Sequence, residues 1–271
     1  MADFSRWQAQ GMPPRRSALI DSIPFRRIET TGQQALAVWE GLKAEGEGWP
    51  VVVGGDEALE LLMEQGRQDG RPPEAILAAA AGLRFPAALH VHQAAERRRF
   101  AVLEAPMQAI FGQARTLSAD EFRAMWGLPA DYPMVAPPMP EVSAAARRLS
   151  AAYDRHGHPL ARVHILLLPT REGAAVPAFL GWGGWNANPP AEFHVAALRS
   201  WQARYGAELV GIHHDTMNLH VARRPATEAE ALALAQEQFT YCEDIVRQGH
   251  GTVAPLAAAL LADDWWRFWW D

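Results

Sequence analysis

The chain ends in Trp265-Trp266-Arg267-Phe268-Trp269-Trp270-Asp271, a segment that holds four of its 11 tryptophans. A chain terminus is usually poorly ordered unless it docks on the protein, and each aromatic side chain buries about 150–250 Å² when it packs. Alternation along the segment places Trp266, Phe268 and Trp270 on one side and the other four residues on the opposite side. The pattern predicts a C-terminal β-strand that has one apolar face and is packed into the core.

The composition is that of a globular protein. Of the 271 residues, 49% are hydrophobic and 21% are charged, which is enough apolar material for a substantial core. The formal net charge of -6 argues against a nucleic-acid-binding protein or a protein of anionic membrane surfaces, because both usually carry a basic excess.

Cysteine content and hydropathy indicate the cellular compartment in which the protein is expected. The single cysteine, Cys242, excludes an intramolecular disulfide. The N-terminal residues lack the apolar core of a signal peptide, and no apolar run approaches the roughly 18 residues of a membrane span. We therefore expect a cytoplasmic bacterial protein without a membrane segment.

Proline content suggests a division of the chain. Five prolines lie between Pro129 and Pro140, which predicts a stiff connector over residues 129–141. The connector separates an N-terminal α/β region, 23–128, from a C-terminal α+β domain, 142–271. The polar residues 1–22 are predicted to form a loosely ordered lead-in.

Hydrophobic periodicity and capping residues predict the elements before the connector. They are a strand at 25–30, a helix at 33–44, a strand from 49 that ends in glycines before an acidic N-cap at Asp56, helices at 57–64 and 73–81, and strands at 87–92 and 100–103.

The same signals predict the elements after the connector. They are a helix at 142–153, a hairpin-like strand pair at 163–168 and 176–180, a helix capped by Asn188 and ended by Gly206, strands at 207–212 and 219–222, a long helix from the capping box of Thr227 and Glu230 to Gly249, and a helix at 253–261. The order lacks regular βαβ alternation, so the predicted class is α+β with a mixed or mainly antiparallel sheet. We expect the terminal strand to insert beside 163–180 and to seal the core beneath the long helix.

Several strings together carry a family resemblance. They are Trp49-Pro50-Val51, Gly184-Trp185-Asn186, Arg204-Tyr205-Gly206-Ala207-Glu208, Arg224-Pro225, Glu237-Gln238, Tyr241-Cys242 and Phe268-Trp269-Trp270-Asp271. In this order, the set resembles the bacterial family known as domain of unknown function 4253, strongly over about residues 160–271 and weakly around residue 50. The family often has Cys after Gly-Trp-Asn, whereas Ala187 and Asn188 follow here. The resemblance implies a fold unit and does not imply an activity.

One set of polar and aromatic residues is a candidate binding site. Helical rotation places Glu237, Tyr241 and Asp244 opposite the apolar side of the long helix, where side chains are often only solvated. The loop Gly181–Asn186 either cradles an anion or makes a tight turn in which tryptophans close the core. Our first hypothesis is a non-enzymatic module, accessory or immunity-type, that binds a basic or polar protein or small ligand and needs no cofactor. Its rim would consist of Trp182, Trp185, Asn186, Glu237, Tyr241 and Asp244.

Histidines supply the main alternative. His90 and His92 would share one face of a strand, and His213, His214 and Asp215 surround a turn. If these groups converge they could hold zinc and activate water, as in a metal-dependent hydrolase; separated pairs are more often surface residues. Cys242 lies on the apolar helix side and is predicted to be an inert thiol. A structural homodimer subunit with an aromatic surface is the third hypothesis.

Overall fold

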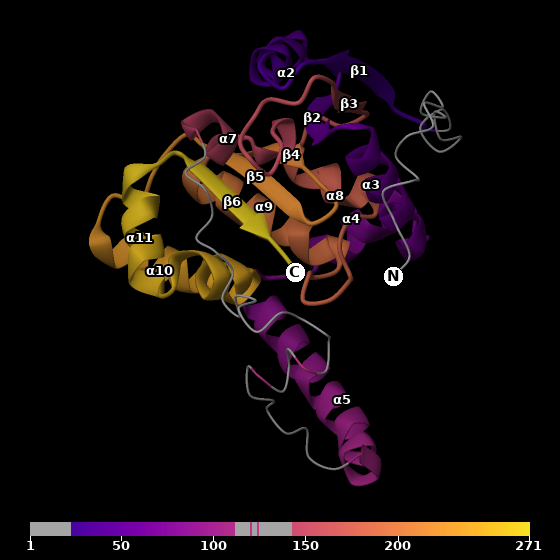
Figure 1. Ribbon diagram of the computed structural model, residues 1–271, viewed down its shortest axis with the longest axis vertical. Helices are drawn as coiled ribbons and strands as arrows, with labels where there is room; N and C mark the ends of the chain where they lie inside the picture. The colour runs from indigo at the N-terminus through magenta and orange to yellow at the C-terminus, as the bar shows by residue number, and fades with distance from the viewer. Residues whose placement is uncertain (1–22, 112–119, 121–123, 125–142) are drawn as a thin grey trace.

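The computed structural model describes residues 23–111, 120, 124 and 143–271 (Figure 1). The predicted lead-in, 1–22, and connector, 129–141, lie outside the described residues. The described residues form one six-stranded sheet with helices packed against it, so the fold is α+β as predicted.

The sheet has the strand order β1-β3-β2-β4-β5-β6. The strands are β1 (Arg26–Thr30), β2 (Trp49–Gly54), β3 (Val163–Leu168), β4 (Ala207–Ile212), β5 (Thr216–Val221) and β6 (Trp265–Trp269). All neighbours pair antiparallel except β2 and β4, which are parallel. Residues on both sides of the predicted connector therefore contribute strands to the same sheet, with β2 between β3 and β4.

Helices and short helical segments connect and cover these strands. They are α2 (Ala35–Glu45), α3 (Asp56–Asp69), α4 (Pro73–Ala81), α5 (Ala87–Phe111), α7 (Ala144–Arg148), η2 (Ser150–Ala152), η3 (Gly173–Ala175), α8 (Val176–Leu180), α9 (Ala191–Tyr205), α10 (Glu228–Tyr241), η4 (Ile245–His250) and α11 (Val253–Ala262). Helix α9 packs on β4, and η2 packs on β2 and β5. Helix α5 projects from the body of the molecule (Figure 1). No helix in the described ranges has the length and apolar character needed to cross a membrane.

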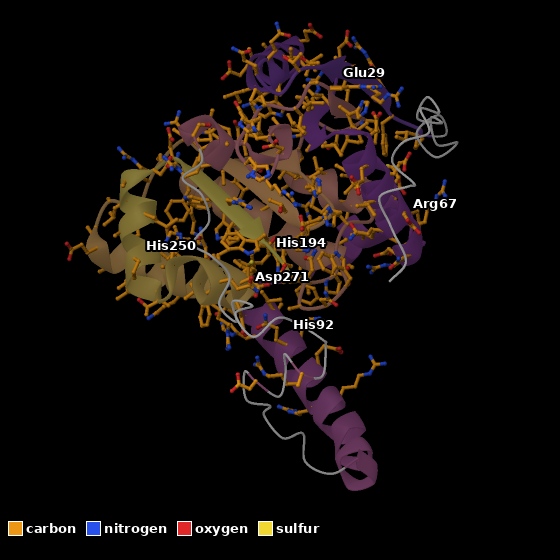
Figure 2. All side chains as sticks on the ribbon, viewed as in Figure 1. Glu29, Arg67, His92, His194, His250 and Asp271 are labelled. Atoms are coloured by element: carbon orange, nitrogen blue, oxygen red, sulfur yellow. The ribbon has the colours of Figure 1, made fainter. Side chains whose placement is uncertain are left out.

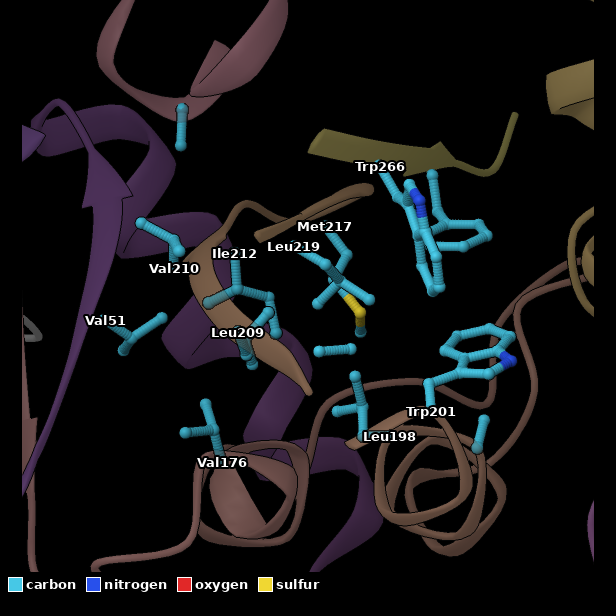
Figure 3. Packing of buried hydrophobic residues seen from close by; sticks show 14 of the residues in the cluster. Val51, Val176, Leu198, Trp201, Leu209, Val210, Ile212, Met217, Leu219 and Trp266 are labelled. Carbon is cyan, nitrogen blue, oxygen red and sulfur yellow. The ribbon is translucent and has the colours of Figure 1, made fainter. Parts of the chain in front are cut away.

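The terminal strand has the two faces that its sequence predicts. Trp266, Phe268 and Trp270 are 3%, 0% and 1% exposed. Phe268 stacks on Trp201 of α9 with ring centroids 5.3 Å apart, and Trp266 meets the same ring edge-on at 5.9 Å. Figure 3 shows Trp266 and Trp201 beside the aliphatic core of β4 and β5. The chain terminus is thus a structural part of the core.

The predicted neighbour of the terminal strand is wrong. β6 pairs with β5, not with the segment 163–180, in the register Thr216↔Trp269 to His220↔Trp265. Both edges of β3 are occupied, by β1 on one side and β2 on the other. The free edge of β5 is the one that β6 takes.

Three further predictions of secondary structure are wrong. Residues 87–92 and 100–103 belong to the single helix α5 and are not strands. Leu89 is buried and Gln93, one turn later, donates from Nε2 to the Thr240 carbonyl at 2.7 Å, so contacts at i and i+4 hold the helix base. Residues 176–180 are helix α8, because Pro177 suits a first helical turn and cannot donate to a sheet.

The third error is the extent of the long helix. Thr227 caps it as predicted, accepting from the Glu230 amide at 3.2 Å, but α10 ends at Tyr241 instead of Gly249. Cys242 is extended, and its thiol donates to the Trp269 carbonyl at 2.8 Å. Docking of β6 thus coincides with the break, after which the chain continues as the π-helical segment η4.

A buried histidine makes the stability of this core pH-dependent. His194 of α9, labelled in Figure 2, is 0% exposed, and its ring lies 4.5 Å from the Trp182 ring and 5.5 Å from the Trp270 ring. Its Nδ1 is hydrogen-bonded to the Tyr241 hydroxyl. Burial lowers the pKa of His194 to about 3, whereas an unfolded chain binds this proton near pH 6.5.

We expect the His194 contribution to stability to be complete above pH 6.5 and to fall as the pH drops toward 3. Below pH 6.5 the unfolded chain binds one more proton than the folded chain, which lowers the unfolding free energy by about 1.4 kcal/mol per pH unit. At pH 5 the loss is about 2 kcal/mol. Urea unfolding of wild type and His194→Gln from pH 7.5 to 5 checks this; parallel pH profiles would contradict it.

Candidate functional site

The sheet topology brings polar residues together at one end of the central strands. Because β2 and β4 are parallel, their carboxyl ends meet at this end, where Gly54 ends β2 and His213 follows β4. Gly54 has φ +111, and a Cβ there would lie 3.0 Å from the Ala151 carbonyl oxygen and 3.4 Å from His213 Cδ2. A side chain at this position would be strained in backbone conformation and crowded against the turn.

The turn between β4 and β5 carries a compact group of potential metal ligands. One ligand atom from each of His213, His214 and Asp215 lies within 4.8 Å of the other two. His213 Nδ1 and His214 Nε2 each lie 3.3 Å from an Asp215 carboxylate oxygen, and the Nδ1 atoms of the two histidines are in hydrogen-bonding contact. Two imidazoles and a carboxylate are a donor set that suits zinc and other divalent transition metals.

Hydrogen bonds from distant parts of the chain hold this turn. The Trp182 indole Nε1 donates to the His213 carbonyl at 2.8 Å, and the Trp270 amide donates to the Asp215 carbonyl at 3.0 Å. The Thr216 hydroxyl donates to Asp215 Oδ1 at 2.8 Å. Such bonds fix the orientation of a ligating carboxylate and its backbone, as outer partners do in metal sites. Trp182 and Trp270 therefore hold the backbone of the turn, and neither of them lines the cleft beside it.

A cleft of about 330 Å³ opens beside the turn. Its lining includes His213, Asp215, Thr216, Arg267, Tyr153, Asp154 and Arg155. Arg267 comes from the outer face of β6, opposite Asn218 of β5 in the register. Its Nε is buried and finds no hydrogen-bond partner within residues 23–111 and 143–271 or at residues 120 and 124. The cleft thus places a guanidinium close to the histidine–aspartate turn.

Burial and neighbouring groups shift the pKa values of Asp215, His214 and Arg267. Burial alone would raise the pKa of Asp215, but hydrogen bonds from His213 and Thr216 and the nearby histidines lower it overall. Burial, followed by the neighbouring His213, lowers the pKa of His214. Burial also lowers the pKa of Arg267, against the opposing influence of Asp215. The turn therefore favours an ionised Asp215 carboxylate beside a neutral His214 imidazole, and these are the forms of the two groups that bind metal.

A buried histidine that contacts a carboxylate lies at the same end of the sheet, near the carboxyl ends of β2 and β4. His164 opens β3 opposite Gly54 and is 1% exposed, and its Nε2 lies 2.6 Å from Asp56 Oδ1 at the start of α3. Arg162 lies 3.4 Å from the other oxygen of the same carboxylate. The predicted role of Asp56 as an N-cap is wrong, because α3 begins at Asp56 and its N-cap is Gly55. The spacing of Asp56, Arg162 and His164 along the chain offers no signal for their contact.

Arg267 was also missed as a site residue. The alternation of the terminal segment correctly places it on the face opposite Trp266, but nothing in the sequence tells which element covers that face. The segment α7–η2 covers it in the structure, since α7 packs against β6 and η2 against β5. The resulting burial of a charged side chain is the feature that marks the cleft.

The structure separates the two predicted groups of histidines. His90 and His92 lie on α5, where His90 is exposed and the His92 ring packs 4.6 Å from the Phe193 ring. Within the part of the chain that the structure describes, the group of potential ligands contains only His213, His214 and Asp215. Because α5 is a helix and not a strand, His90 and His92 do not share one face.

The six residues of the predicted rim do not form one surface. Trp182 and Tyr241 are 0% and 1% exposed and lie in the aromatic core, so the solvent side predicted for Tyr241 is wrong. Helix α10 packs on two sides, against α11 and, through Tyr241, against the Trp201 ring 4.9 Å away.

The other rim residues have separate surroundings. The Glu237 carboxylate accepts from Trp201 Nε1 at 2.6 Å and pairs with Arg204, and Asp244 Oδ2 accepts from the Asp271 amide at 3.0 Å. Trp185 is half-buried and Asn186 is exposed in the loop before α9.

Cys242 is buried, as predicted. Burial raises the pKa of its thiol to about 12, opposed by backbone hydrogen bonds. Because the thiolate is the reactive form, this thiol is chemically inert at neutral pH.

Comparison with known proteins finds one family model that is similar to the C-terminal part of the chain. No curated protein and no solved structure matches the chain. The family model described as domain of unknown function (DUF4253) matches residues 164–271. This range contains β3 from its second residue, β4 to β6, the His213–Asp215 turn and Arg267, whereas β1 and β2 precede it. The C-terminal part of the chain, residues 164–271, is thus similar to the DUF4253 family.

Proposed function

We propose that this protein is a binding module that holds a divalent cation on His213, His214 and Asp215 and a small anionic ligand in the adjoining cleft. The observation that carries the proposal is the convergence of three ligand atoms within 4.8 Å beside a cleft that Arg267 lines. Three protein ligands leave coordination positions for water or for a ligand atom.

Charge supports an anionic ligand. With neutral histidines, the positive charges of Arg155 and Arg267 are balanced by Asp154 and Asp215. The Asp154 carboxylate is further engaged by the backbone amides of its own turn, including that of His156 at 2.8 Å. A divalent cation would therefore give the cleft a net positive charge, and ligand binding should depend on the cation.

The Arg267 guanidinium suggests how the anion would be recognised. Guanidinium groups bind carboxylate and phosphate groups through two parallel N–H donors. Arg267 packs its guanidinium 5.0 Å from the Trp269 ring centroid, which restricts its freedom before a ligand arrives. A fixed cationic group in a partly desolvated cleft favours a compact oxyanion.

The first test is cation binding by metal-free protein. We expect zinc or manganese to bind at one ion per chain, and His214→Ala and Asp215→Asn to weaken binding at least tenfold because each removes a ligand. His90→Ala, which changes an exposed histidine of α5, should bind as wild type does. Isothermal titration measures this, and a saturating cation at 100 times Kd should add about 2.7 kcal/mol to the unfolding free energy. Equal binding by all variants, or no binding by wild type, contradicts the proposal.

The same preparation tests the anion. Sulfate serves as the probe oxyanion, titrated at constant ionic strength with and without saturating zinc chloride. We expect binding only in the presence of zinc, and its loss in Arg267→Gln. Arg247→Gln is the matched control, because Arg247 is exposed and forms an ion pair with Glu243, away from the cleft residues. If sulfate binds equally well without zinc and in Arg267→Gln, the anion binds at another site and this part of the proposal is wrong.

A metal-dependent hydrolase is the second candidate, and the same three ligands favour it. A cation with three protein ligands can lower the pKa of a bound water and supply a nucleophile. Zinc-loaded protein would then hydrolyse a chromogenic phosphate or carboxylic ester, and Asp215→Asn would not. Binding of zinc and sulfate without turnover supports the binding module instead.

The biological setting of the module is also part of the proposal. We propose a non-catalytic accessory or immunity-type role in a bacterial cytoplasm. The support is the lack of a nucleophile-elbow motif or a dinucleotide fingerprint in the sequence, together with the family match. A homodimer is a third alternative, which light scattering distinguishes.

A further inference from the structure

A second cavity, of about 820 Å³, lies between the base of α5 and the loop before α9. Figure 2 labels His92 at this base. The helix contributes His92 and Glu96, the loop contributes Asn188, Pro189 and Pro190, and Glu243 follows α10. None of these residues belongs to the His213–Asp215 turn or its cleft.

The Asn188 side chain is the unusual feature of this cavity. Asn188 is 2% exposed, and among the residues that the structure describes neither its Oδ1 nor its Nδ2 has a hydrogen-bond partner. A buried polar group without a partner is costly, so native structures rarely keep both ends of an amide in this condition. Asn188 is one of the residues that line the cavity, so a ligand there is the nearest source of the missing hydrogen bonds.

The loop holds Asn188 in place through its backbone. Its amide donates to the Trp185 carbonyl at 2.8 Å, and its carbonyl accepts from the Gly184 amide at 3.1 Å. The predicted role of Asn188 as a helix cap is wrong, because Pro190 is the N-cap of α9. Asn186, at φ +47, adopts a conformation that non-glycine residues rarely take. The main chain of the loop is thus fixed, and the Asn188 amide is left for another partner.

The amide specifies the chemistry of that partner. An asparagine side chain offers an acceptor and a donor side by side in one plane, and it pairs with a planar group whose own donor and acceptor are adjacent. The edge of a nucleobase has this arrangement, and asparagine reads bases in this way. His92, which has a planar imidazole ring, lines the same cavity, as do Pro189 and Pro190. His92 is itself supported from behind by Phe193, whose ring is tilted 32° to it.

We propose that this cavity binds a nucleobase, with Asn188 pairing to the base edge and His92 packing against its face. A volume of about 820 Å³ accommodates a nucleoside or a mononucleotide. The carboxylates of Glu96 and Glu243, both partly exposed, can accept hydrogen bonds from sugar hydroxyls or exocyclic amines. The net charge of -6 favours a free nucleoside over a polynucleotide. The cavity is independent of the cation site.

Isothermal titration with adenosine, guanosine, cytidine and uridine tests the proposal on the full chain. We expect one or more nucleosides to bind and Asn188→Leu, which keeps the shape but removes both polar atoms, to weaken binding at least tenfold. His92→Ala should also weaken binding, whereas the matched control His90→Ala, on the same helix but exposed, should not. Asp215→Asn should bind nucleosides as wild type does. A single-stranded oligonucleotide is the second probe and should bind no more tightly than the free nucleoside.

Thermal melting of each variant separates loss of binding from loss of fold. If Asn188→Leu does not fold, the comparison of His92→Ala with His90→Ala decides. The proposal is overturned if no nucleoside binds wild type at millimolar concentration, if folded Asn188→Leu and His92→Ala bind as wild type does, or if only the oligonucleotide binds.

Discussion

A chain truncated after Asp264 is expected to lose cooperative unfolding altogether. The deletion removes β6 and with it Trp266, Phe268 and Trp270, which are at most 3% exposed. Substituting one buried aromatic residue by alanine typically costs 3–5 kcal/mol, and whole domains are stable by roughly 5–15 kcal/mol. The loss of three such side chains and of the pairing with β5 therefore consumes the stability of the fold.

Calorimetry and near-ultraviolet circular dichroism measure this effect. The truncated chain should show no heat-absorption peak and no near-ultraviolet signal from ordered tryptophan. Trp265→Ala is the control, because Trp265 lies on the other face of the same strand and is only half-buried beside His220. It should melt cooperatively at a modestly lower temperature. A truncated chain with a sharp melting transition would contradict the structural role of the terminus.

The second large effect is expected when the chain is divided at the predicted connector. Residues 142–271 alone should not fold cooperatively, because β2 is missing between β3 and β4. Every residue of β2 is buried, and Val51, Val52 and Val53 are 0% exposed. Without β2, the two neighbouring strands expose unpaired backbone groups and a broad apolar face, which favours aggregation.

A chain of residues 23–271 is the matched control, since it is shortened but retains every described strand. It should melt as the full chain does. Adding a separate chain of residues 23–128 to residues 142–271 should restore a cooperative transition if β2 can pair in trans. A cooperative melt of residues 142–271 alone would show that the C-terminal part is an independent folding unit.

The secondary-structure elements that were predicted correctly are those that depend on interactions between residues close together in the sequence. The strand at β6, the capping box of α10 and the end of α9 at Gly206 depend on alternation, on a side-chain hydrogen bond and on a left-handed residue. Each can be seen within a few residues of sequence. The wrong strand predictions in α5 and α8 came from short apolar runs, for which alternation and helical spacing are hard to distinguish.

The candidate site shows the same limit. His213, His214 and Asp215 could be proposed as ligands because they are adjacent in sequence, and the structure places their ligand atoms together. Arg267 and the polar atoms of Asn188 could not be assigned, since their importance comes from burial and from polar atoms that find no hydrogen-bond partner in the described part of the chain. Burial depends on which elements cover a residue, and this information is spread over the whole chain.

The sequence by itself determined that Trp266, Phe268 and Trp270 face inward, that the class is α+β, and that the C-terminal part resembles the DUF4253 family. Only the tertiary structure decided that β6 pairs with β5, that β2 joins the sheet from before the connector, and that Trp182 and Trp270 hold the His213–Asp215 turn. The physical reason is the range of the interactions. Alternation and capping act between near neighbours, whereas the choice of strand partner depends on which sheet edges the rest of the chain leaves open.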